Sequence, residues 1–148
     1  MDFDIKKLGV DDLTLAKRLF LFFQVDDGVV NPTAASDEYL ISLLSRDDFH
    51  VIVAVKNETV IGGLTAHELV MYKEETREIF LYEIAVEPLH RKKGVAKALI
   101  EFLKEICAAK RITYMFVGTE ADNAPAIRLY ETTGGKYEDI AWFVYEFD

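Results

Sequence analysis

A run of three cations followed by a glycine is the segment of this chain best suited to bind an anion. The run Arg91-Lys92-Lys93-Gly94 stands directly before Val95 to Ala109, which has the apolar spacing of an amphipathic helix. The first turn of a helix leaves backbone N–H groups without partners and carries partial positive charge. Glycine has no side chain to block an approaching ligand. The segment therefore predicts a pocket for a phosphate-bearing ligand, against the alternative of a solvated basic loop.

A second motif lies downstream, between Asn123 and Gly134. Asp122 or Asn123 can cap a helix, Pro125 suits its first turn, and Gly134 can end it. Ala126 and Tyr130 are four residues apart and so share one face of that helix. Tyr130 is either an aromatic side chain packed on a sheet or a phenol placed for chemistry, and the spacing Asn-x-x-Ala-x-x-x-Tyr-x-x-x-Gly favours the second interpretation.

Glu83 is the carboxylate best placed for proton transfer. It lies in the apolar segment Phe80 to Val86, where burial would raise its pKa. It could accept a proton or hold an ammonium group, and the alternative is a structural ion pair on the opposite face. Strand alternation directs the side chains of Tyr82 and Glu83 to opposite faces unless a bulge intervenes, so Tyr82 is kept as the alternative candidate for this role. Other carboxylates that could line an acceptor cleft, most of them expected on the surface, are Glu68, Asp26, Asp27, Glu120, Glu138 and Asp139.

The elements that position these groups follow from apolar periodicity and turn residues. We expect strands at residues 3–8, 51–55, 60–66, 80–86, 112–117 and 142–147, with residues 67–72 continuing in strand, and helices at 13–23, 36–45, 95–109 and 124–133. Gly62-Gly63 within a strand predicts a bulge or a close backbone approach. The order β-α-α-β-β-β-α-β-α-β predicts an α/β domain with a mixed sheet.

In this order the motifs resemble the GCN5-related N-acetyltransferases, the GNAT family. The resemblance rests on the apolar strand, the Arg-x-x-Gly-x-Ala turn that opens a helix, a further strand, and the Asn…Ala…Tyr…Gly helix, and it covers nearly the whole chain. It implies a mostly antiparallel sheet flanked by helices, with acetyl-coenzyme A (acetyl-CoA) as acetyl donor. Gly135 departs from the family, because many members carry Phe there, and this affects a packing contact.

The resemblance also assigns roles to residues. In the family the basic-glycine turn binds the pyrophosphate of acetyl-CoA, the preceding strand pairs with the pantetheine arm, and the tyrosine is often the general acid. The expected catalytic residues are thus Tyr130 and Glu83. The expected cofactor-binding residues are Ile84, Ala85, Val86, Arg91, Lys92, Lys93, Gly94, Val95, Ala96, Asn123 and Ala126.

A narrower resemblance concerns the acceptor. Leu81 to Val86 with His90-Arg91, and Ala124-Pro125-Ala126 with Leu129-Tyr130, are similar to the aminoglycoside 3-N-acetyltransferases, although related amine acetyltransferases share much of this match. It implies transfer to a primary amine of a small cationic acceptor, with an aminoglycoside antibiotic as the narrower expectation. The alternatives are a polyamine or protein N-acetyltransferase, and a non-catalytic acyl-CoA-binding module.

Size and composition set outer limits on these interpretations. The 148 residues predict one domain, 1–148, and the net charge of −9 disfavours a nucleic-acid partner. Negative charge suits a cationic substrate or serves solubility alone. No membrane segment or signal pattern is recognised, and the single cysteine fits a cytoplasmic protein. The three histidines show no metal-ligand spacing, so no metal is expected, and a homodimer is expected by analogy with the resembled family.

Overall fold

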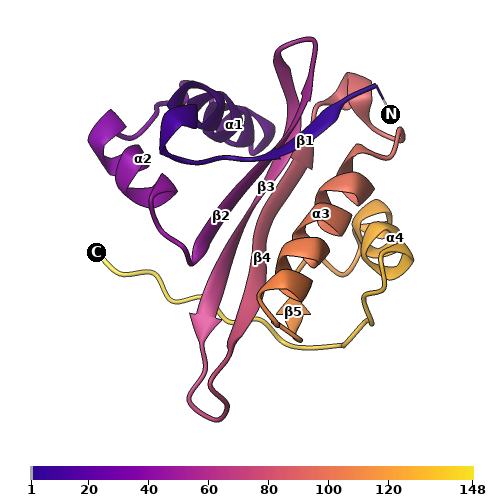
Figure 1. Cartoon of the computed structure of the whole chain (residues 1–148). Coiled ribbons are helices and arrows are strands. Elements are labelled where there is room, and N and C mark those ends of the chain that lie inside the picture. The colour runs from indigo at the N-terminus through magenta and orange to yellow at the C-terminus, as the bar shows by residue number, and fades with distance from the viewer. Residues whose placement is uncertain (1) are drawn as a thin grey trace. The chain divides into compact units, whose positions relative to one another are not determined.

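The computed structural model describes residues 2–148, and the chain divides into two compact units, Met1–Gly118 and Thr119–Asp148. The first unit holds a five-stranded sheet in the order β1-β2-β3-β4-β5, in which β1 to β4 are antiparallel and β5 is parallel to β4 (Figure 1). The mixed, mostly antiparallel sheet confirms the predicted α/β fold class. The single domain expected over 1–148 stays a prediction.

The elements follow the predicted order closely. The strands are β1 (Asp4–Lys7), β2 (Phe49–Lys56), β3 (Thr59–Val70), β4 (Arg77–Val86) and β5 (Met115–Phe116), and the helices are α1 (Leu13–Asp26), α2 (Asp37–Leu44), α3 (Val95–Ala109) and, in the second unit, α4 (Ala124–Thr132). Among residues 2–148, no helix is long and apolar enough to cross a membrane.

Helices cover both faces of the sheet, which explains the apolar runs in its central strands. Helices α1 and α2 lie on one face and α3 lies on the other (Figure 1). Leu19 and Phe23 of α1 share a buried cluster with Val51 and Val53 of β2. On the other face, α3 buries a stripe that includes Leu99. A strand buried on both faces needs apolar side chains at successive positions, so β2 lacks polar alternation.

The double glycine of β3 is a point of close backbone approach, as predicted. A Cβ atom at Gly62 would lie 2.8 Å from the carbonyl oxygen of Ala85, and one at Gly63 would lie 2.5 Å from Cδ1 of Leu19. The pairing with β2 also skips Ile61, which makes a bulge beside Gly62. Neither glycine can therefore be enlarged without moving α1 or β4.

A second bulge lies in β4 and changes the direction of its side chains. Thr65 pairs with Glu83, but the next residue, Ala66, pairs with Leu81, so Tyr82 is the extra residue. A bulge interrupts strict alternation, and two consecutive side chains can then share a face. This is the condition under which Tyr82 and Glu83 can act on the same side of the sheet.

The strand predicted at residues 142–147 is wrong, because residues 135–148 form neither helix nor strand. A strand needs a neighbouring strand to pair its backbone N–H and C=O groups. Residues 119–148 contain α4 and no strand, so their unit offers no such neighbour. Trp142 and Phe143 are 69% and 80% exposed, which shows that apolar composition alone does not make a strand. The strand expected at 112–117 shortens to β5, and residues 67–70 extend β3.

Candidate active site

The turn before α3 is open at the helix start. Gly94 is the residue before the helix and has a φ of 83°, a left-handed conformation that glycine adopts without penalty. No side chain caps the first turn, and no atom lies within 4 Å of a Cβ atom built on Gly94. The first backbone N–H groups, including those of Val95 and Ala96, have no partner within a helix. The turn therefore fits a phosphate group.

Arg91 is engaged differently from its two neighbours. Its Nε donates to the carbonyl oxygen of Val86 at 2.9 Å, and its Nη2 donates to Oδ1 of Asp26 at 3.1 Å. These bonds tie the turn to the end of β4 and the end of α1. The side chains of Lys92 and Lys93 are exposed, so they are the cations left to attract an anion at this turn.

The last part of β4 has an open edge. β3 pairs with β4 along its whole length, but β5 pairs only with Ile79 and Phe80. Among the strands of the described chain, none pairs with the other edge of residues 81–86. Unpaired N–H and C=O groups of such an edge can bind an extended ligand that carries amides. Ile84, Ala85 and Val86, the predicted pantetheine contacts, lie on this edge next to the turn, and the carbonyl oxygen of Val86 is already occupied by Nε of Arg91.

Glu83 is a half-buried carboxylate in a negatively charged setting. Burial and the carboxylates of Asp27 and Asp26 raise the pKa of Glu83 to about 7, and Asp27 also shares a hydrogen bond with it. Within residues 2–148, no lysine or arginine forms an ion pair with Glu83. A carboxylate whose pKa lies near neutrality can exchange a proton with a substrate at neutral pH.

Tyr82 and Glu83 lie on the same face of the sheet. Asp26 and Asp27, which act on Glu83, stand at the end of α1. The ring of Tyr82 contacts the ring of His67, and that ring in turn contacts Phe49, which packs against the α1 cluster. The bulge in β4 therefore brings both predicted candidates to the α1 side.

A row of aromatic side chains beside Glu83 was missed by sequence reasoning. It comprises Phe49, His67, Tyr82, Phe80, Phe116 and Tyr114, and we call it the aromatic strip. The alternation of aromatic residues in Phe80-Leu81-Tyr82 and Tyr114-Met115-Phe116 was a visible signal. Its continuation through His67 and Phe49 depends on the register of β2 and β3, which the sequence does not reveal.

Residues of the second motif lie in the second unit. Oδ1 of Asn123 accepts a hydrogen bond from the backbone N–H of Ala126 at 3.2 Å, so Asn123, one of the two predicted caps, caps α4. Burial raises the pKa of Tyr130. The backbone N–H of Gly135 donates to the carbonyl oxygen of Tyr130 at 2.8 Å, and a Cβ on Gly135 would lie 2.9 Å from that oxygen. A side chain at position 135 would collide with that oxygen, which explains the glycine at this position.

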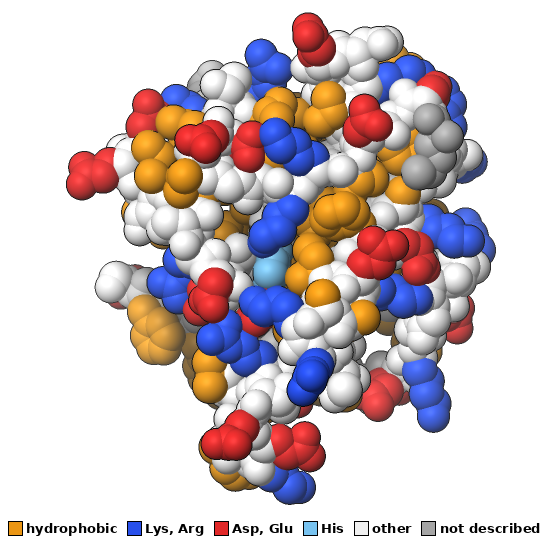
Figure 2. All heavy atoms as spheres, viewed as in Figure 1, with side chains coloured by type: hydrophobic (Ala, Val, Ile, Leu, Met, Phe, Trp, Pro, Cys, Tyr) orange, Lys and Arg blue, Asp and Glu red, His pale blue; other side chains and the backbone are white. Residues whose placement is uncertain are grey.

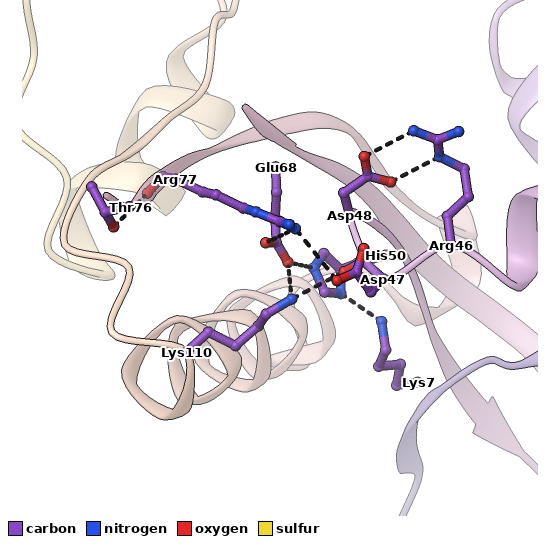
Figure 3. A network of polar contacts seen from close by, with 9 residues as sticks. All are labelled: Lys7, Arg46, Asp47, Asp48, His50, Glu68, Thr76, Arg77 and Lys110. Carbon is purple, nitrogen blue, oxygen red and sulfur yellow. Dashed lines mark hydrogen bonds and ion pairs between the residues drawn. The ribbon is translucent and has the colours of Figure 1, made fainter. Parts of the chain in front are cut away.

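Glu68 was expected to be able to line an acceptor cleft, and the structure contradicts this. Its side chain is fully buried and accepts bonds from Nε2 of His50 at 2.5 Å, Nζ of Lys110 at 2.6 Å and Nη1 of Arg77 at 3.2 Å (Figure 3). Lys110 directly follows α3, so this network lies on the α3 side of the sheet. In Figure 2, Lys or Arg side chains lie directly above and below a histidine near the middle of the face shown, with hydrophobic side chains beside it.

The protonation pattern of this network follows from its contacts. Nζ of Lys7 lies 2.5 Å from Nδ1 of His50, and a lysine can only donate there. His50 therefore donates from Nε2 to Glu68 as a neutral imidazole. Burial, with the charge of Lys7, lowers the pKa of His50. Burial works against the Glu68 carboxylate, but hydrogen bonds from Lys110 and His50 hold its pKa below the usual range.

Comparisons with known proteins agree with this architecture. Residues 16–134 match the model of the acetyltransferase (GNAT) family. Streptothricin acetyltransferase of Escherichia coli is 36% identical over 144 residues, covering 94% of this chain and 79% of the relative. An aminoglycoside acetyltransferase from an uncultured soil metagenomic sample, solved with trehalose, superposes with a TM-score of 0.93 at 26% identity, covering 99% of this chain and 97% of that one.

Two further structures extend the comparison. The same soil aminoglycoside acetyltransferase in complex with sisomicin also gives a TM-score of 0.93, at 25% identity and the same coverage. A second aminoglycoside acetyltransferase from an uncultured soil metagenomic sample is 31% identical, with a TM-score of 0.86 and 99% of both chains covered. The matched family model spans most of the sequence, and the fold and the turn before α3 agree with it. The chain belongs to the GNAT family of acetyltransferases.

Proposed function

We propose that this protein transfers an acetyl group from acetyl-CoA to a primary amine of a small, sugar-bearing polycation of the aminoglycoside or streptothricin class. The observation that carries the proposal is the acidic group formed by Glu83, Asp27 and Asp26, the last of which also pairs with Arg91, beside the open edge of β4. A cationic acceptor is attracted to such a group, and a carboxylate with a pKa of about 7 can take the proton that an ammonium must lose.

The chain would divide the work between binding and proton transfer. Backbone N–H groups at Gly94 to Ala96, with Lys92 and Lys93, would hold the pyrophosphate of acetyl-CoA, and Ile84 to Val86 would offer backbone groups to its amides. Bound acetyl-CoA supplies the acetyl group as an activated thioester. Glu83 would accept the proton of the acceptor ammonium, and Tyr130 is proposed as the proton donor to the leaving group.

Two relatives support different acceptors within this class. The streptothricin acetyltransferase has the higher sequence identity, whereas the soil enzymes with the superposable fold are aminoglycoside acetyltransferases. Acetylation at the 3-amino group of an aminoglycoside is the finer form of the proposal. A polyamine or protein acceptor and a non-catalytic acyl-CoA-binding role are the alternatives. A cytoplasmic location and a homodimer stay predictions.

Release of free thiol from acetyl-CoA across a panel of amines tests the proposal. The panel contains sisomicin, streptothricin, spermidine and a peptide with a free N-terminal amine. We expect turnover with sisomicin or streptothricin, and mass and NMR analysis of the product identifies the acetylated amine. Turnover with the peptide or spermidine alone would replace the proposed acceptor, and tight acetyl-CoA binding without turnover would favour the binding module.

The phosphate site has a separate test at Gly94. Aspartate and asparagine have the same size, and both tolerate a positive φ better than most residues. Gly94→Asp places a negative charge where the pyrophosphate would lie, so we expect acetyl-CoA to bind more than about 30-fold more weakly than to the matched Gly94→Asn variant. Calorimetry measures both affinities. Equal affinity in the two folded variants would remove the turn from the proposed site.

A further inference from the structure

The aromatic strip crosses four strands on the α1 side of the sheet. Neighbouring ring centroids along the row are 4.8 Å apart for Phe49 and His67, 5.6 Å for His67 and Tyr82, and 5.6 Å for Tyr82 and Phe80. The row continues with centroids 4.8 Å apart for Phe80 and Phe116 and 6.0 Å apart for Phe116 and Tyr114. These spacings lie in the range of direct aromatic contacts, so the rings form one continuous surface.

Much of this surface is open to a ligand. Tyr82 is 62% exposed and Tyr114 is 52% exposed, while the other rings are partly buried. The folded chain thus leaves two large aromatic side chains uncovered at the same strip. The core does not use them, since the buried cluster on this face is formed by aliphatic and Phe side chains of α1, α2 and β2.

The strip is continuous with the acidic group. Tyr82 directly precedes Glu83, the bulge places both on one face, and Asp27 at the end of α1 shares a hydrogen bond with Glu83. A ligand that lies over Tyr82 therefore has an apolar, π-rich surface under it and carboxylates at its end. Rings that carry ammonium groups match this combination, because they have flat C–H faces and positive charge in one molecule.

We propose that the aromatic strip is a second acceptor subsite, in which Tyr82 stacks against a ring of an amino sugar while its ammonium groups face Glu83 and Asp27. The inference rests on the proposed function and deepens it. It makes the protein selective for amines carried on sugar-sized rings over linear polyamines of similar charge, because only the ring-bearing acceptor uses the strip.

A matched pair of tyrosines tests this subsite. Tyr82→Ala removes the central ring of the strip, and Tyr72→Ala removes a tyrosine that is 98% exposed in the β3–β4 hairpin. Tyr82→Phe keeps the ring. Calorimetry with sisomicin as the probe should show binding about 5- to 30-fold weaker for Tyr82→Ala, and within about twofold of wild type for Tyr82→Phe and Tyr72→Ala. Spermidine affinity should change less than about twofold in all three variants.

The outcomes separate the subsite from the proposed reaction. If sisomicin binds through Tyr82 but no amine is acetylated, the proposed function fails and the subsite stands. If sisomicin is acetylated while Tyr82→Ala binds it as tightly as Tyr72→Ala does, the subsite is overturned and the reaction stands. Failure of the wild-type protein to bind sisomicin also overturns it. A Tyr82→Ala variant that loses self-association in sedimentation, with sisomicin affinity unchanged, would assign the strip to a second copy of the chain instead.

Discussion

Glu68 and Glu83 are two glutamates on neighbouring strands with opposite electrostatic surroundings. Glu68 on β3 is fully buried on the α3 side and accepts bonds from a histidine, a lysine and an arginine, and the lysine and histidine hold its pKa low against the effect of burial. Glu83 on β4 is half-buried on the α1 side, with two aspartates near it, and its pKa rises to about 7. Positively charged partners stabilise the ionised form of Glu68, whereas the neighbouring aspartates destabilise the ionised form of Glu83.

The difference indicates which carboxylate stabilises the fold and which is available for chemistry. A buried charge is tolerated when its partners satisfy it, and a network of this kind fixes the relative positions of the strands and helix that contribute to it. A carboxylate left beside like charges costs stability at neutral pH, and proteins keep such groups chiefly at functional sites.

The largest effect is expected from Glu68→Gln. The substitution leaves Lys110, Arg77 and Lys7 without their shared negative charge, and breaking a buried pair in this way costs about 3–5 kcal/mol. We expect the free energy of unfolding in urea at pH 7 to fall by that amount. The matched control is Glu101→Gln in the exposed Glu101–Lys104 pair at 3.4 Å, which should change it by less than about 0.5 kcal/mol.

The penalty of Glu68→Gln should also depend on pH. The pKa of Glu68 is lowered in the folded protein from a reference of 4.5, so its stabilising contribution is present above about pH 4.5 and is lost as the pH falls through the folded pKa. His50, whose pKa is also lowered, adds a loss of stability as the pH falls below about 6.5. A penalty that is equally large at pH 3 and pH 7 would contradict the ionised network.

Glu83→Gln should change the free energy of unfolding in the opposite direction from Glu68→Gln. The folded pKa is raised from 4.5 to about 7, so the contribution of Glu83 to stability is present below about pH 4.5 and is lost as the pH rises through 7. The shift of about 2.5 units corresponds to an upper limit of about 3.4 kcal/mol, and solvent around a half-buried group reduces this to about 1–2 kcal/mol. Urea unfolding at pH 8 should show Glu83→Gln more stable than wild type by that amount, with no difference at pH 4.

A smaller effect is expected from Asp27→Asn. Removing the like charge that raises the pKa of Glu83 most should lower that pKa, so the acidic limb of the kcat/KM profile should move down by about 0.5–1 pH unit. Asp4→Asn, at an exposed aspartate on β1, is the matched control and should leave the limb in place. A limb that stays at the same pH in Asp27→Asn would mean that another group produces it.

Local patterns in the sequence predicted much of the fold and part of this site. The basic turn that opens a helix at Gly94 and a cap at Asp122 or Asn123 follow from nearest neighbours in the chain, and the structure has the helix start at Gly94 and the cap at Asn123. The close backbone approach at Gly62 and Gly63 was also predicted from the sequence, because two glycines inside a strand usually mark such an approach or a bulge.

The features that the sequence did not predict depend on strand register and on contacts between segments that are distant in the chain. The bulge at Tyr82 decides that Glu83 faces Asp27, and it arises from a one-residue shift against β3. The burial of Glu68 required His50 and Lys110 to meet across 18 and 42 residues of chain. The strand expected at residues 142–147 failed for the same reason, since strand formation needs a partner that composition does not specify.

The central claim is that Glu83 accepts the proton of the acceptor amine, and the pH profile of kcat/KM tests it most directly. Wild type and Glu83→Gln are compared with the same acetylated amine, so that titration of the acceptor is common to both. We predict an acidic limb with an apparent pKa of about 7 in wild type, and in Glu83→Gln a loss of that limb with kcat/KM at least about tenfold lower at pH 8. An unchanged limb and a kcat/KM within about twofold of wild type would contradict the claim.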